Sequence, residues 1–182
     1  MKTKNLFLIA FCIFSLTASA FAQNTTVERE QSNIEKFSAK SGTLVERRFV
    51  NVGKLKLIEV QVLTITDLIS NAKISGVRFE MQTATRYTTD TKVAFLDQDE
   101  VDGLIKSINA LKTKVFNTTK DTYTEVTFKS RSGFEAGCFF SDGKWTTYLK
   151  LERFDKNSQT FMKPEDFDEL LSLLQLAKQK FE

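Results

Sequence analysis

The stretches DEVDGLIKSINALKTKV (residues 99–115) and EDFDELLSLLQLAKQKF (residues 165–181) decide the fold, because they match each other at a constant offset of 66 residues. Each begins with acidic residues and then places apolar residues at intervals of three and four, which is the pattern of a helix buried on one face. The matched apolar positions are Val101, Leu104, Ile105, Ile108, Leu111 and Val115 in the first, and Phe167, Leu170, Leu171, Leu174, Ala177 and Phe181 in the second. The sequence therefore predicts two long amphipathic helices, over 99–115 and 164–180.

A two-residue period precedes each helix and predicts strands. Val77, Phe79 and Met81 alternate with polar residues in the clearest half-buried strand of the chain. Asp142-Gly143 is the strongest hairpin signal, because a type I′ turn needs positive φ at both residues. The strands are expected over residues 43–52, 54–67 (after a turn near 51–53), 77–82, 92–96, 122–131, 134–140, 144–153 and 159–162.

The repeated order predicts an α+β fold of tandem duplicated ββββα units. We expect the first unit over residues 41–118 and the second over 119–182, with antiparallel sheets and the two long helices sharing one core. One four-stranded sheet with one helix buries little apolar surface alone, so the two copies are expected to pack together.

The first 22 residues have the pattern of an export signal. Lys2 and Lys4 precede a short apolar run, and small residues near Ala20 and Ala22 allow cleavage after either. The run is too short for a membrane span, so we expect an exported protein, periplasmic or extracellular, with no stable span once the signal is removed. Residues 23–40 fit either a tether or a short helix.

The composition excludes several kinds of chemistry. The chain has no histidine, and Cys138 is the one cysteine outside the signal. This composition excludes catalytic triads that need histidine, zinc or haem bound by histidine, and metal clusters bound by thiolates. We therefore expect no cofactor, no metal and no enzymatic activity. Loss of Lys2 and Lys4 lowers the net charge from +3 to +1, which gives no electrostatic reason for a nucleic-acid partner. We expect a monomer or a homodimer.

The predicted element order resembles, at the level of fold, tandem four-strand-plus-helix proteins. These include the Whirly and PUR binders of single-stranded nucleic acid and the exported β-lactamase-inhibitor proteins. The resemblance covers residues 41–182 as an order of elements and brings no family motif with it. The chain is otherwise similar to small exported bacterial proteins. Likeness of fold does not by itself imply function.

Four further candidates each have an ordinary structural explanation. Glu80 and Glu152 could form a pair of hydrolase carboxylates, but each lies on a strand beside a basic residue and fits a cross-strand ion pair. The acidic run 97–103 lacks the ligand spacing of a calcium loop and fits a helix N-terminus better. Cys138 and Trp145 fall on the apolar faces of their strands and are expected in the core.

One surface of the second unit is the predicted ligand-binding site. Tyr123, Phe139 and Tyr148 fall on the side of their strands opposite to the core, with Lys129 and Lys150 between them. Aromatic side chains among basic ones on a sheet can stack on a ligand or form a protein interface. The same residues would be ordinary core if the first unit or residues 23–40 covered them.

The predicted function is a non-catalytic exported binding module for a protein or glycan ligand, acting through this aromatic and basic face. A carboxylate-based hydrolase is one alternative. An exported enzyme inhibitor is the other, and it rests on likeness of fold alone.

Overall fold

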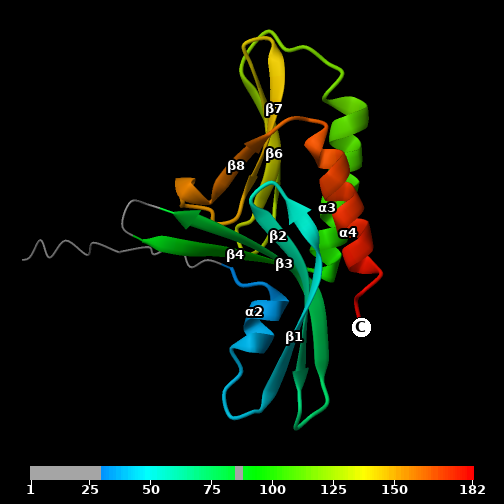
Figure 1. Cartoon of the computed structure of the whole chain (residues 1–182). Helices are drawn as coiled ribbons and strands as arrows, with labels where there is room; N and C mark the ends of the chain where they lie inside the picture. Colours follow the sequence, from blue (N-terminus) through cyan, green and yellow to red (C-terminus); the bar gives the residue numbers. More distant parts are fainter. Residues whose placement is uncertain (1–29, 85–87) are drawn as a thin grey trace, which may run out of the picture.

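A computed structural model describes residues 30–84 and 88–182. It shows an α+β protein with two four-stranded antiparallel sheets and helices (Figure 1). The predicted signal, residues 1–22, lies outside the described residues, as do residues 23–29 and 85–87.

The first sheet has the strand order β1-β2-β3-β4. Its strands are β1 (Val45–Leu55), β2 (Ile58–Asp67), β3 (Lys73–Ala84) and β4 (Thr89–Asp97). The turn predicted near residues 51–53 is wrong: the chain reverses at Lys56-Leu57, where Lys56 has φ +53°, and residues 51–53 form a break in register within β1. Gly53 serves helix packing instead, because a Cβ there would lie 2.6 Å from Leu173 Cδ2.

The second sheet has the order β5-β6-β7-β8. Its strands are β5 (Thr124–Lys129), β6 (Glu135–Ser141), β7 (Lys144–Lys150) and β8 (Gln159–Met162), with a short 3₁₀ helix η1 (Lys156–Ser158) before β8. Asp142 and Gly143 have φ +52° and +75°, which confirms the positive φ predicted for this hairpin.

Helices α3 (Gln98–Lys114) and α4 (Asp166–Lys178) lie side by side against both sheets (Figure 1). Their apolar stripes and the helix-facing residues of the two sheets form one core. Phe79 of the first sheet stacks on Phe134, just before β6, with ring centroids 4.9 Å apart. Cys138 and Trp145 lie in this core as predicted, and the Trp145 indole donates a 2.7 Å hydrogen bond to the Thr118 carbonyl.

A third helix, α2 (Asn33–Ser38), packs on the opposite face of the first sheet. Ile34 is its buried anchor and forms a small separate core with Leu63 and Ile65. Backbone N–H groups of Asn33 and Ile34 donate to the Asp97 carboxylate over 2.7 and 3.0 Å, which ties α2 to the start of α3.

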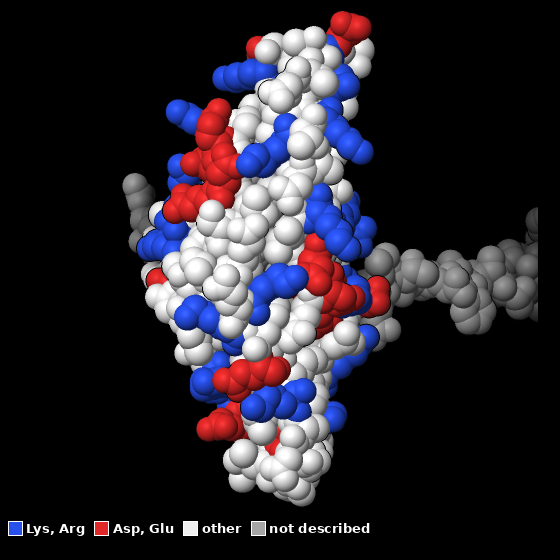
Figure 2. Space-filling model, turned by 90° about the vertical axis from the view of Figure 1, so that its right-hand side faces the viewer, with Lys and Arg blue, Asp and Glu red and all other residues white. Residues whose placement is uncertain are grey.

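The side of the molecule formed by α3 and α4 carries both signs of charge. Basic and acidic side chains alternate over this side, with uncharged surface between them (Figure 2). Lys112 pairs with Asp168 and Lys178 with Asp102, so ion pairs bridge the two helices. This side therefore offers no extended basic surface.

Candidate functional site

The five residues predicted to bind a ligand lie on one surface, the face of the second sheet turned away from α3 and α4. We call it the outer face. Alternation along the strands and the pairing of β5 to β8 place the following residues on it: Tyr123, Glu125, Thr127, Lys129, Glu135, Gly137, Phe139, Thr146, Tyr148, Lys150, Gln159 and Phe161.

Three aromatic rings form a row across the outer face. Tyr123 and Phe161 expose 65% and 61% of their surface, and Phe139 lies half-buried between them. The ring centroids of Tyr123 and Phe139 are 6.1 Å apart, and those of Phe139 and Phe161 are also 6.1 Å apart. We call these three side chains the aromatic row. It is open to solvent at both ends.

Tyr148 lies on the outer face, but its side chain is buried beneath its neighbours. Its exposure is 6%, and its hydroxyl is 2.9 Å from Thr127 Oγ1 on β5. The ring crosses Gly137, where an added Cβ would lie 3.1 Å from Tyr148 Cζ. Burial raises the pKa of the Tyr148 phenol, because the charged form is disfavoured away from water. A ligand on this face would meet the exposed rings before it met Tyr148.

The charged groups predicted for the site also lie on the outer face. Lys129 Nζ is 3.4 Å from Glu135 Oε1, and Lys150 donates a 2.5 Å hydrogen bond to the Arg153 carbonyl. The Tyr123 hydroxyl donates to the Glu125 carboxylate, which raises the pKa of Tyr123. The face therefore combines aromatic surface with charges of both signs.

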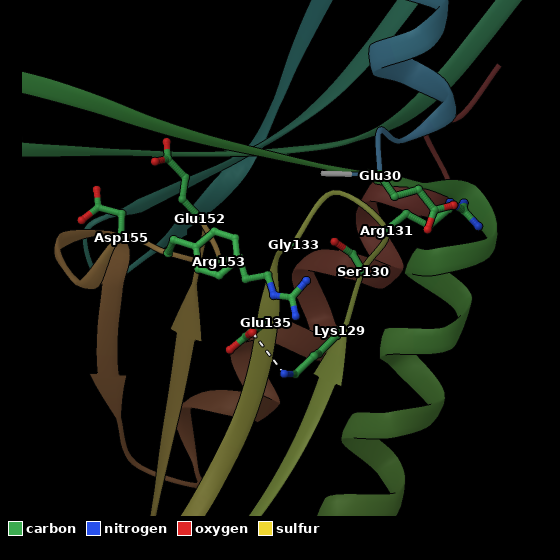
Figure 3. Close-up of a pocket in the computed structure, with 10 residues that line it drawn as sticks. Glu30, Lys129, Ser130, Arg131, Gly133, Glu135, Glu152, Arg153 and Asp155 are labelled. Atoms are coloured by element: carbon green, nitrogen blue, oxygen red, sulfur yellow. Dashed lines mark ion pairs between the residues drawn. The ribbon is translucent and has the colours of Figure 1, made fainter. Parts of the chain in front are cut away.

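A cavity of about 640 Å³ opens at the end of the outer face where the β5–β6 turn meets the β7–β8 loop. Lys129 and Glu135 belong both to the outer face and to the wall of the cavity (Figure 3). Residues 152–155 form the facing wall. We call this the corner cavity. The corner cavity thus adjoins the end of the outer face that carries Lys129 and Glu135.

Arg153 points its guanidinium into the corner cavity (Figure 3). Its Cζ lies 5.2 Å from the ring centroid of Phe154, a side chain that is 80% exposed. Arg153 forms no ion pair with any residue among 30–84 and 88–182. A guanidinium in this state can bind a carboxylate with two parallel hydrogen bonds.

Arg131 lines the same cavity, but its guanidinium is already paired with carboxylates of this chain. Its guanidinium lies 2.7 Å from oxygens of Asp97 and Asp99, and its backbone N–H donates to Glu100 over 2.7 Å. The hydrogen bond from Arg131 lowers the pKa of the Asp99 carboxyl. These contacts fix the β5–β6 turn to the start of α3, so the cavity has one rigid wall. They also show that the acidic run 97–103 caps a helix and holds Arg131.

Lys92 of β4 supports the facing wall. Its Nζ lies 2.6 Å from Asp155, 2.6 Å from Asp90 and 3.7 Å from Glu152. Hydrogen bonds to Asp155 and Asp90 raise the pKa of Lys92, so it stays charged across the physiological range. The first sheet therefore anchors the loop that carries Arg153.

The other chemical candidates lie apart from this surface. Glu80 pairs with Arg78 and lines a different cavity from Glu152. Burial raises the pKa of the Cys138 thiol to about 11, which leaves it protonated at neutral pH. No group of three potential metal-ligating side chains occurs among residues 30–84 and 88–182.

Sequence reasoning missed Phe161 and the corner cavity. Phe161 alternates with the buried Met162 along β8 and so faces outward. The alternation of outward and buried residues along this short strand was the sequence signal that could have placed Phe161 on the outer face. The cavity depends on a loop and a turn that meet only in the folded chain, which no local pattern shows.

Comparison of the chain with protein-family models, with curated proteins and with solved structures finds no match. None of the helices in the described part of the chain is long and apolar enough to cross a membrane.

Proposed function

We propose that the protein is a non-catalytic binding module that takes a protein or glycan ligand on the outer face of the second sheet. The observation that carries this proposal is the aromatic row, in which Tyr123 and Phe161 remain largely exposed. Covering exposed aromatic surface with a ligand lowers the free energy, because apolar surface is removed from water. Contiguous exposed patches of this kind mark binding sites. Export to the periplasm or the cell exterior is part of the proposal and rests on residues 1–22.

Binding is favoured over a carboxylate-based hydrolase. A glycosidase needs two carboxyl groups facing one substrate bond, one of them as a proton donor. Glu80 and Glu152 line separate cavities, and each lies near a cation, Arg78 or Lys92. Because they line separate cavities, the two carboxylates do not face a common substrate bond.

We also propose that the two halves are tandem duplicated ββββα units that share one core. Each sheet has its strands in sequence order and is followed by a helix, α3 or α4. The buried apolar positions of α3 correspond to buried positions of α4 at the offset of 66, as Val101 to Phe167 and Leu104 to Leu170 illustrate. If the halves are duplicated units, equivalent positions on the outer faces of the two sheets can be compared directly.

The test of binding is retention on material from the producing cells. Exported proteins and envelope polysaccharides are immobilised separately, and the purified protein is passed over each. We expect one of the two to retain the protein, and we expect Tyr123→Ser/Phe161→Ser to lose that retention. Leu176→Ser is the matched control, because Leu176 is 45% exposed on α4, away from the outer face. Equal retention of the double variant and the parent would contradict the proposal.

A further inference from the structure

The first sheet already shows how an outer face of this kind is covered. Leu63 and Phe95 lie on its outer face and pack with Ile34 of α2. The two sheets can be aligned by placing β8 on β4 and following the strand pairing inward. In this alignment Phe161 corresponds to Phe95, and Phe139 corresponds to Leu63. A helical segment of polypeptide thus covers the first pair, while Phe161 of the second pair stays exposed.

The wall of the corner cavity nearest the outer face has a surplus of positive charge. Lys129 and Glu135 lie on this wall, and Arg153 comes from the facing loop but points its guanidinium across the cavity toward them (Figure 3). Since Lys129 pairs with Glu135 and Arg153 pairs with no residue among those described, one cation there is not neutralised. That cation favours an anionic group on the ligand.

The facing wall has the opposite surplus. Three carboxylates, those of Asp90, Glu152 and Asp155, surround Lys92, and Lys150 is the other cation that acts on Asp155. Glu152 and Asp155 line the corner cavity, so the excess negative charge adjoins the space a ligand would enter. The cavity therefore attracts a positive group on one side and a negative group on the other.

We propose that the ligand is a segment of a partner protein that lays apolar side chains on the aromatic row and places an acidic and a basic group in the corner cavity. The inference rests on the proposed function and narrows its ligand to polypeptide. Arg153 binds the carboxylate, and Glu152 with Asp155 binds the basic group. A neutral glycan would leave both sets of charges unmatched, and a nucleic acid would meet the acidic wall with like charge. Aromatic and arginine side chains together are typical of the energetic centre of protein interfaces.

A displayed library of random 12-residue peptides, selected on the purified full chain, tests the inference. We expect the enriched peptides to carry an acidic and a basic residue near an aromatic or aliphatic one. Their affinity should fall at least ten-fold in Arg153→Ala and several-fold in Glu152→Gln, and it should weaken as salt is added. Lys106→Ala is the matched control, since Lys106 is an exposed cation on α3, and it should leave affinity unchanged.

The outcomes separate this inference from the proposed function. If the affinity of the peptides falls in Phe161→Ser but is unchanged in Arg153→Ala and Glu152→Gln, the inference is overturned and the proposed binding face stands. An oligosaccharide array that gives binding dependent on Phe161, with no enriched peptide, also overturns the inference alone. If neither the library nor the array yields a ligand sensitive to Phe161→Ser, both proposals fail. Arg153→Lys, which keeps the charge but loses the two-pronged geometry, should bind between the parent and Arg153→Ala.

Discussion

The two sheets share a strand order but use their outer faces differently. On the first sheet, α2 covers Leu63 and Ile65, and Phe95 packs against the same cluster. On the second sheet, Phe161 occupies the place that corresponds to Phe95 and is 61% exposed. The first outer face thus contributes to folding stability, whereas the exposed rings of the second contribute little to it. We interpret the second face as one that is completed by a partner.

The largest expected effect tests the covered face. Ile34→Ala removes the buried anchor of α2 and should lower the free energy of unfolding by about 2–5 kcal/mol, because it leaves a cavity over Leu63 and Ile65. Urea denaturation followed by circular dichroism measures the loss. A loss below about 0.5 kcal/mol, the range of ordinary surface substitutions, would show that α2 does not stabilise the first sheet.

The next effect tests the support beneath the aromatic row. Gly137→Ala should lower the free energy of unfolding by about 1–3 kcal/mol through overpacking. The new Cβ would lie 2.7 Å from the Val126 carbonyl oxygen and 3.1 Å from Tyr148 Cζ, so the backbone of β5 or the tyrosine ring must move. The same denaturation experiment measures it. An unchanged midpoint would mean that Tyr148 does not lie across Gly137.

A smaller effect tests the hydrogen bond that holds Tyr148. Tyr148→Phe should cost about 1 kcal/mol of stability, because the hydroxyl contact with Thr127 is lost in a buried place. Thr127→Val should cost a similar amount, and the double variant should cost less than the sum of the two. Additive losses would show that the two hydroxyls do not interact.

The smallest effect tests the open face itself. Phe161→Ser should change the free energy of unfolding by less than about 0.5 kcal/mol, since its side chain is mostly in water. Thermal and urea unfolding of the variant beside the parent provide the measurement. A loss of 2 kcal/mol or more, typical of a truncated core side chain, would place Phe161 in a packed core and remove the contrast between the sheets.

Much of the fold follows from sequence because it depends on local periodicity. The apolar stripe of residues 99–115 and the acidic turn before it predict a helix there, and α3 covers Gln98–Lys114. Asp142-Gly143 predicts a tight hairpin, because few other pairs tolerate positive φ at both positions. Alternation along β6 predicts the buried Cys138 and places Phe139 on the opposite face.

The failures share a cause, which is dependence on contacts between distant segments. Gly53 suggested a turn, but its small size allows Leu173 of α4 to approach β1 closely, and the turn occurs at Lys56 instead. The strand predicted over 144–153 ends at Lys150, and the following loop forms one wall of the corner cavity. The loop that carries Arg153 is held in part by Lys92, from the other sheet, which pairs with Asp155.

Photo-crosslinking from an exposed aromatic position on each of the two outer faces tests the central claim most directly. A benzophenone side chain replaces Phe161 in one version and Phe49 in another, since Phe49 is 51% exposed on the first sheet. Both versions are produced in the cells that make the protein and are then irradiated. The account predicts a discrete crosslinked product from position 161 and none from position 49. Products of equal yield from both positions, or from neither, would contradict a binding face confined to the second sheet.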